Sequence, residues 1–150
     1  MKIVWLSTCI VAAFVIQSRV SLFGVTPNMT VLVAYYLGIK GGAVRGMALG
    51  SMIGVIEDSV GGSILGPNLM GKGMVGFLAS FSSGSLLRWT PLLGMIAIFS
   101  LTVMDGAVVF LSRSIFGASP GPASAGIPTL LAQGFLNLVT GIFIKPRNVD

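Results

Sequence analysis

The sequence predicts an all-helical, polytopic membrane protein with six transmembrane helices in a single integral membrane domain. Hydrophobic residues make up 54% of the 150 residues and charged residues only 9%, and the mean hydropathy is +0.96. A soluble domain carries about 25% charged residues, so this chain cannot cover a surface that faces water. Short stretches of glycine, proline, serine or basic residues separate the apolar runs, which approach the roughly 20 residues that a helix needs to cross a bilayer.

Six helices follow the apolar runs, and we predict them at residues 3–17, 28–39, 43–60, 68–81, 91–111 and 128–144. The first is interpreted as a retained transmembrane helix because no small-x-small cleavage site follows it. Pro27 and Asn28 are typical of a helix start and open the second. Pro91 opens the fifth, after an Arg88–Trp89 pair typical of a membrane interface. Residues 112–126, rich in Ser, Gly, Pro and Ala, are predicted to form a loop.

The basic residues indicate the orientation of the chain and argue against nucleic-acid binding. They stand singly between apolar runs, whereas a nucleic-acid site needs a clustered patch. If the N-terminus is cytoplasmic, the opposite side holds Arg19 and Arg113, with Lys72 buried or nearby. The cytoplasmic side then holds Lys2, Lys40, Arg45, Arg88, Lys145 and Arg147. Positive charge is enriched on the cytoplasmic side of membrane proteins, so both termini are predicted to be cytoplasmic.

A stripe of glycines runs along the third predicted helix and ends at a carboxylate. From Gly38 to Gly54 every fourth residue is glycine, and the next step of four reaches Asp58. The glycines of the third predicted helix and of the residue before it are Gly42, Gly46, Gly50 and Gly54. Steps of four advance about 400°, so these positions share one face of a helix. Small residues let membrane helices approach closely. We therefore expect a groove that receives a partner helix, and a buried structural role for Asp58 near Gly61–Gly62.

Charged residues also lie inside other predicted spans. Because a charge within a membrane is costly, such residues are functional candidates. At 1.5 Å per residue, Asp58 and Asp105 lie roughly 22 and 21 Å from the inner ends of their helices, and Lys72 lies about 6 Å from an outer end. These side chains are thus expected in the outer third of the membrane, where they could pair or reach water. Glu57 and Lys72 are expected to extend towards water, and the role of Asp105 is left open.

The remaining polar positions predict helix contacts and no chemistry. Gln133 and Asn137 are four residues apart and share a helix face, where they would bond another helix or line a polar cavity. The chain has no histidine and one cysteine, Cys9. This composition excludes a histidine-containing metal site or catalytic triad. We predict no catalytic residue, no metal and no cofactor.

The segment that ends the third helix and opens the fourth resembles the signature of MreD, a family of bacterial rod shape-determining membrane proteins. In that family a G-L-x-x-D element is followed by a short turn and L-G-x-N. Here residues 54–58 read GVIED, with Val55 in place of leucine, and residues 65–68 read LGPN. The motif residues are Asp58, Leu65, Gly66 and Asn68. The resemblance covers about residues 17–81, and Asn28 stands where the family often has an acidic residue.

The resemblance implies a nonenzymatic component of the cell-elongation machinery, the rod complex or elongasome, in the bacterial cytoplasmic (inner) membrane. Its partners would be MreC, through the single transmembrane helix of MreC, and indirectly MreB filaments, RodA and a class B penicillin-binding protein. These partners link the family to peptidoglycan synthesis and cell shape. The implied fold is similar to the membrane-embedded substrate-binding component of energy-coupling-factor transporters.

That similarity of fold supplies an alternative function, the substrate-binding component of a vitamin transporter. Such components carry an A-x-x-x-A pattern in the first helix. Here Thr8 precedes Ala12 and Cys9 precedes Ala13, so small residues have this spacing without a pair of alanines. A tightly bound small molecule in the purified protein would favour this alternative over a scaffold.

Overall fold

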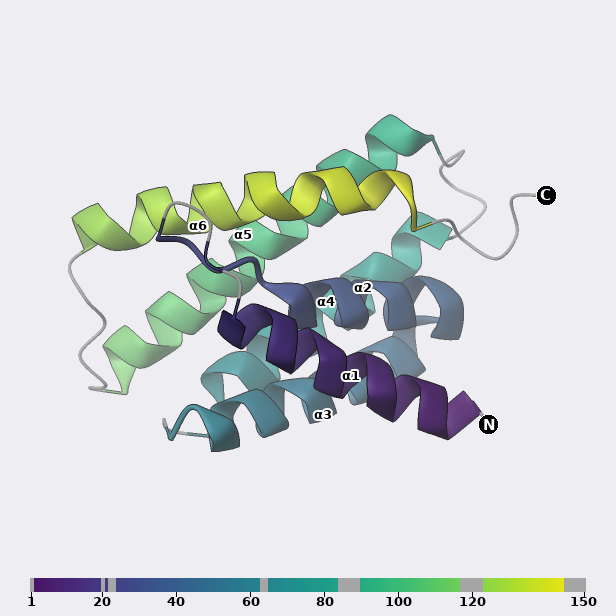
Figure 1. Cartoon of the computed structure of the whole chain (residues 1–150), viewed down its shortest axis with the longest axis horizontal. Coiled ribbons are helices and arrows are strands. Elements are labelled where there is room, and N and C mark those ends of the chain that lie inside the picture. Colours follow the sequence, from purple (N-terminus) through teal and green to yellow (C-terminus); the bar gives the residue numbers. More distant parts are fainter. Residues whose placement is uncertain are drawn as a thin grey trace.

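The computed structural model describes residues 2–19, 21, 24–62, 65–83, 90–116 and 123–144. Within these ranges the chain is all-helical and has no β-strand, which confirms the predicted class. Six α-helices and two short 3-10 helices follow in order (Figure 1): α1 (Lys2–Arg19), α2 (Met29–Gly41), α3 (Ala43–Val60), α4 (Pro67–Ala79), η1 (Ser80–Ser83), α5 (Pro91–Ile115), α6 (Ala123–Leu138) and η2 (Val139–Ile142).

The starts of α2 and α3 follow from residues that the sequence marks. Asn28 is the N-cap of α2, and its side-chain oxygen accepts a hydrogen bond from the backbone N–H of Val31 at 3.3 Å. Such a bond satisfies one of the free donors of a first helical turn. Gly42, with φ +80°, ends α2 and precedes α3. The predicted and observed bounds of α3 coincide at Ala43–Val60.

The predicted loop at residues 112–126 is too long at both ends. α5 continues to Ile115, with Ser112 buried and the hydroxyl of Ser114 bonded to the carbonyl of Phe110 inside the helix. α6 already begins at Ala123 and contains Pro128. A proline removes the backbone donor at its own position, so α6 lacks that bond and continues. The Arg88–Trp89 pair and the tail from Lys145 lie outside the described residues.

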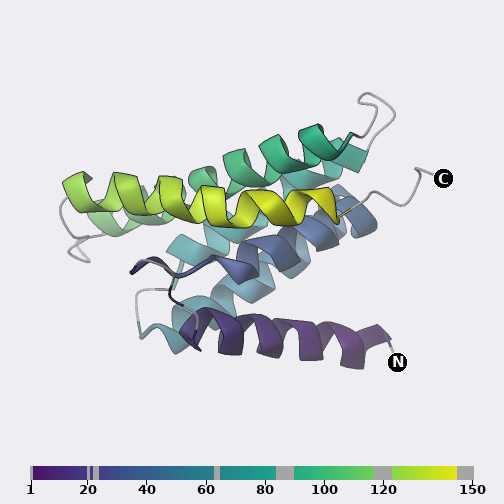
Figure 2. The same ribbon diagram turned by 45° about the horizontal axis from the view of Figure 1, so that its top comes forward.

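The helices form a bundle whose two ends differ. α5 and α6 lie side by side and run in opposite directions in both views (Figures 1 and 2). α2 lies between α1 and α6, and α3 packs against α4. The start of α1 and the end of η2 lie at one end of the bundle. The opposite end gathers the last turns of α1, α3 and α5 and the first turns of α2, α4 and α6 (Figure 1).

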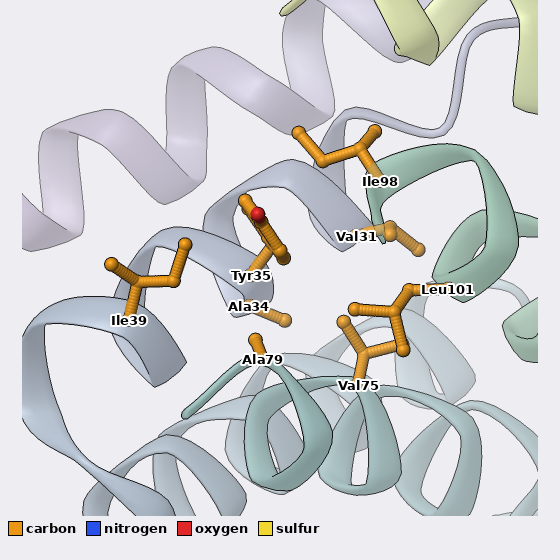
Figure 3. Close-up of a cluster of buried hydrophobic side chains, with 8 residues drawn as sticks. All are labelled: Val31, Ala34, Tyr35, Ile39, Val75, Ala79, Ile98 and Leu101. Carbon is orange, nitrogen blue, oxygen red and sulfur yellow. The ribbon is translucent and has the colours of Figure 1, made fainter. Parts of the chain in front are cut away.

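A small apolar core lies between α2, α4 and α5 (Figure 3). Its buried side chains are Val31, Ala34, Tyr35, Ile39, Val75, Ala79, Ile98 and Leu101. Many large apolar side chains point outwards instead, among them Val44 at 78% exposure and Phe135 at 63%. Extended apolar surface of this kind marks contact with a membrane or another protein.

Among the described helices, α5 is the one long and apolar enough to cross a bilayer. Its 25 residues span about 38 Å, more than the roughly 30 Å hydrocarbon core. α2 and the segment Gly126–Ile142 are apolar and shorter. The structure thus supports one of the six predicted spans by length and composition.

Candidate functional site

The glycine stripe of α3 lies directly against the backbone of α4. A Cβ atom added to any of three glycines would collide with a backbone carbonyl oxygen of α4, and the colliding pairs are Gly46 with Gly76, Gly50 with Lys72 and Gly54 with Asn68. Each step of four along α3 is matched by a step of four back along α4, so the helices are antiparallel and in close register. Gly42 differs, because a Cβ there would meet nothing within 4 Å.

This packing confirms the stripe as a helix-packing face, and it corrects the expectation that the helix in the groove belongs to another protein. α4 of the same chain fills the groove at Gly46, Gly50 and Gly54. Gly42 instead supplies the positive φ at the α2–α3 junction, a conformation that glycine adopts without steric cost. The stripe therefore fixes the internal pairing of α3 with α4.

Asp58 caps the N-terminus of α4 from the last turn of α3. It is fully buried, and its Oδ2 accepts hydrogen bonds from the backbone N–H groups of Gly66 at 2.9 Å and Leu69 at 3.2 Å. Its Oδ1 accepts from the backbone N–H and the side-chain amide of Asn68, at 3.2 and 2.8 Å. The first N–H groups of a helix have no partner within it and carry partial positive charge. Asp58 therefore takes the role of an N-cap side chain for α4, although it belongs to α3.

The residues around this cap explain the local sequence. Gly66 is the N-cap of α4 and has φ +141°, a region that favours glycine, and it contributes no side-chain bond. Pro67 then occupies the first helical turn, where the missing N–H of proline is harmless. Leu65 is 63% exposed. The predicted buried structural role of Asp58 is thus confirmed, and its partner is the start of α4 rather than Gly61–Gly62.

Lys72 lies at the centre of a buried charge network. Its Nζ is 2.9 Å from Oε2 of Glu57 and 3.4 Å from Oδ2 of Asp105. It also donates to Oδ1 of Asn68 at 3.0 Å. The Lys72 side chain is 0% exposed, so the expectation that it extends towards water is wrong, whereas that of Glu57 keeps 18% exposure. Two carboxylates and an amide satisfy the three ammonium donors, which allows the charge to remain buried.

Asn28, the N-cap of α2, and Thr30 within α2 complete the network, and neither role was predicted from the sequence. Asn28 donates from Nδ2 to Oδ2 of Asp105 at 3.0 Å. The Thr30 hydroxyl lies 2.7 Å from Oε2 of Glu57 and 2.9 Å from Oδ1 of Asn28. Because Asn28 is 77 residues from Asp105 in the chain, local patterns carry no sign of this pairing.

Gln133 and Asn137 connect α6 to this region. Gln133 donates to the backbone carbonyl of Thr26 at 3.1 Å. Asn137 is buried and donates to the carbonyl of Asn28 at 3.0 Å, with Thr102 of α5 at 3.3 Å. The two amides thus contact other parts of the chain, and Gln133 also lines a cavity.

A polar cavity of about 270 Å³ adjoins the network. Its polar lining is Gln17, Asn28, Glu57, Asn68, Asp105, Arg113 and Gln133. Val109, Phe110 and Leu130 supply apolar walls. Three of the lining residues each have a buried atom without a hydrogen-bond partner: Oε1 of Gln17, Oδ1 of Asp105 and Nε of Arg113. Among the described residues, no group of three or more acidic, Cys or His side chains is placed to hold a metal.

One family matches the chain over nearly its whole length. The model described as rod shape-determining protein MreD matches residues 1–144. The chain belongs to the MreD family. No curated protein and no solved structure matches it.

Membership of the MreD family places the chain among membrane proteins that act in rod shape determination. MreD-family members are structural membrane proteins and are not known as enzymes. The match includes α5 and α6, which lie beyond the residues 17–81 that carry the resemblance in the sequence. The motif residues Asp58, Gly66 and Asn68 of this MreD-family chain form one hydrogen-bonded unit at the α3–α4 junction.

Proposed function

We propose that this chain is a nonenzymatic, multi-pass scaffold of the rod complex that helps to maintain cell shape from within the bacterial inner membrane. The observation that carries the proposal is the MreD-family match over residues 1–144. The geometry supports it, because the buried charges of α3, α4 and α5 bind one another and the start of a helix. Such contacts stabilise a bundle, and they arrange no nucleophile beside a base.

The proposed partner in the membrane is the transmembrane helix of MreC, through which the complex reaches MreB filaments, RodA and a class B penicillin-binding protein. Since α4 fills the glycine groove, the docking face must be an outer one. The exposed methionines of the described chain all lie on the α3–α4 pair, at Met47, Met52, Met70 and Met74. Methionine adapts well to partner surfaces, so we place the MreC helix on this pair, with both termini of the scaffold cytoplasmic.

Photo-crosslinking in cells tests this placement. A photoreactive residue would replace Met52 or Met74 on the proposed face, or Phe135 on α6, in a strain that also produces tagged MreC. We expect crosslinks to MreC from positions 52 and 74 and none from position 135 or from the buried Val75. Crosslinks from Phe135 alone would move the docking face to α6, and no crosslink from any exposed position would contradict the scaffold proposal.

The cavity is the observation behind a second candidate, the substrate-binding component of a vitamin transporter. Its volume of about 270 Å³ lies below the roughly 300–1,000 Å³ typical of drug-sized ligands, which favours the scaffold. Mass spectrometry of small molecules released from the purified protein separates the two candidates. A vitamin recovered in equimolar amount would support the transporter component.

A further inference from the structure

The buried atoms without partners around the cavity are of two opposite kinds. Oε1 of Gln17 and Oδ1 of Asp105 are acceptors, whereas Nε of Arg113 is a donor. Buried polar atoms in folded proteins almost always have a partner, so three such atoms on side chains that line one cavity require an explanation. A molecule that satisfies all three must itself both donate and accept hydrogen bonds.

The charged side chains that line the cavity are also of two opposite kinds, acidic and basic. Glu57 and Asp105 share the single ammonium group of Lys72 at their end of the cavity. The hydrogen bonds and ion pairs of Glu57 in the described part of the chain all fall on Oε2. Arg113 has no ion pair there, and it lies eight residues further along α5, about 12 Å along the helix axis. A simple anion would meet the carboxylates, and a simple cation would meet the guanidinium.

We propose that this cavity binds a small zwitterionic group, with its ammonium at Glu57 and Asp105 and its anionic group at Arg113. The group must have ammonium N–H donors, because the carboxylates of Glu57 and Asp105 on the cavity wall accept hydrogen bonds as well as attract positive charge. Arg113 suits a phosphate or carboxylate, which its fork of donors can hold at two points. Phosphoethanolamine, either free or as the head group of phosphatidylethanolamine, has both ends.

The position and size of the cavity agree with such a ligand. Glu57 retains 18% exposure, so the cavity reaches the surface of the bundle. Val109, Phe110 and Leu130 supply apolar wall beside the polar groups, as an amphipathic molecule requires. The inference requires only that the chain lies in a membrane, as its family does, and it can therefore fail without affecting the scaffold proposal.

Native mass spectrometry of the full chain in detergent tests the proposal with phosphatidylethanolamine, phosphatidylcholine and phosphatidylglycerol of identical acyl chains. Choline has no N–H donor, and phosphatidylglycerol has no cation. We therefore expect phosphatidylethanolamine to bind about tenfold more tightly than either. Equal binding of the three lipids would overturn the proposal, as would a cavity filled by water alone. Competition by free phosphoethanolamine would identify a soluble source, and its failure would identify the lipid.

Two variants and a matched control complete the test. Arg113→Gln should weaken binding of phosphatidylethanolamine about tenfold, and Arg113→Lys should recover part of it. Val109→Trp, which fills the cavity without a change of charge, should abolish the preference for ethanolamine. Arg19→Gln removes an equal charge from an exposed position at the same end of the bundle and should change the affinity less than about twofold. Wild-type affinity in Arg113→Gln would contradict the proposal.

Discussion

Asp58 on α3 and Asp105 on α5 are both buried, at 0% and 1% exposure, yet the protein surrounds them differently. Each oxygen of Asp58 accepts two hydrogen bonds, all from the start of α4. Asp105 receives Asn28 and Lys72 on Oδ2, while its Oδ1 has no partner. At the α3–α4 junction both carboxylate oxygens therefore have hydrogen-bond partners within the chain, whereas beside α5 one carboxylate oxygen has none. Burial alone therefore does not show whether both oxygens of a carboxylate have hydrogen-bond partners.

The close packing of α3 on α4 predicts the largest effect. Gly50→Leu would force a side chain into the backbone of Lys72, and we expect it to lower the stability by more than about 3 kcal/mol because backbone cannot move aside. Thermal unfolding in detergent, followed by circular dichroism, measures the loss. Val44→Leu, at a position on α3 that is 78% exposed, is the control and should leave the transition unchanged. A stable Gly50→Leu protein would show that the groove has room for a further helix.

Amide substitutions of the two carboxylates test the comparison itself. Asp58→Asn would turn an N–H₂ group towards backbone N–H donors, and a loss of about 3 kcal/mol is expected. In Asp105→Asn the amide nitrogen can take the place of the unpartnered Oδ1 while its oxygen still accepts from Lys72, so the expected loss is about 1 kcal/mol. Urea or thermal unfolding of both variants measures the difference. Equal losses, or a larger loss for Asp105→Asn, would contradict the contrast between the two sites.

Asn28→Asp is expected to have an effect between those of the two amide substitutions. The change replaces the donor to Asp105 by a second carboxylate, and we expect a loss of about 1.5 kcal/mol. Asn28→Asp combined with Asp105→Asn restores a donor and an acceptor with their roles exchanged, so the double variant should recover most of that loss. A double-variant loss equal to the sum of the single losses would mean that the two side chains do not interact.

The residues predictable from the sequence are those whose signal is local. Gly42 and Gly61 bracket α3, and Asn28 opens α2, because turn and cap chemistry acts over a few residues. The burial of Lys72 was not predictable in this way. Helical rise gives the height of a side chain along its helix but not the neighbouring helix that it faces, so Glu57 and Lys72 were expected near water.

The contacts that form the site join distant segments. Asn28 and Asp105 are 77 residues apart, and Asn137 reaches the backbone of Asn28 over 109 residues. Neither pair has a local pattern. The end of α5 was also missed, because Ser112 and Ser114 are typical of loops in sequence, whereas the Ser114 hydroxyl here bonds back to its own helix. Polar residues inside a helix need such a partner, and only the structure identifies it.

The central claim is that the bundle is closed at α3–α4 and has an open polar cavity beside α5. Labelling of single cysteines by a small water-soluble thiol reagent tests it most directly, in a Cys9→Ala background. Val109→Cys on the cavity wall should react readily, whereas Ile53→Cys, buried at 1% exposure in α3, should remain unlabelled in the folded protein. Equal reactivity at the two positions, or no reaction at position 109, would contradict the account.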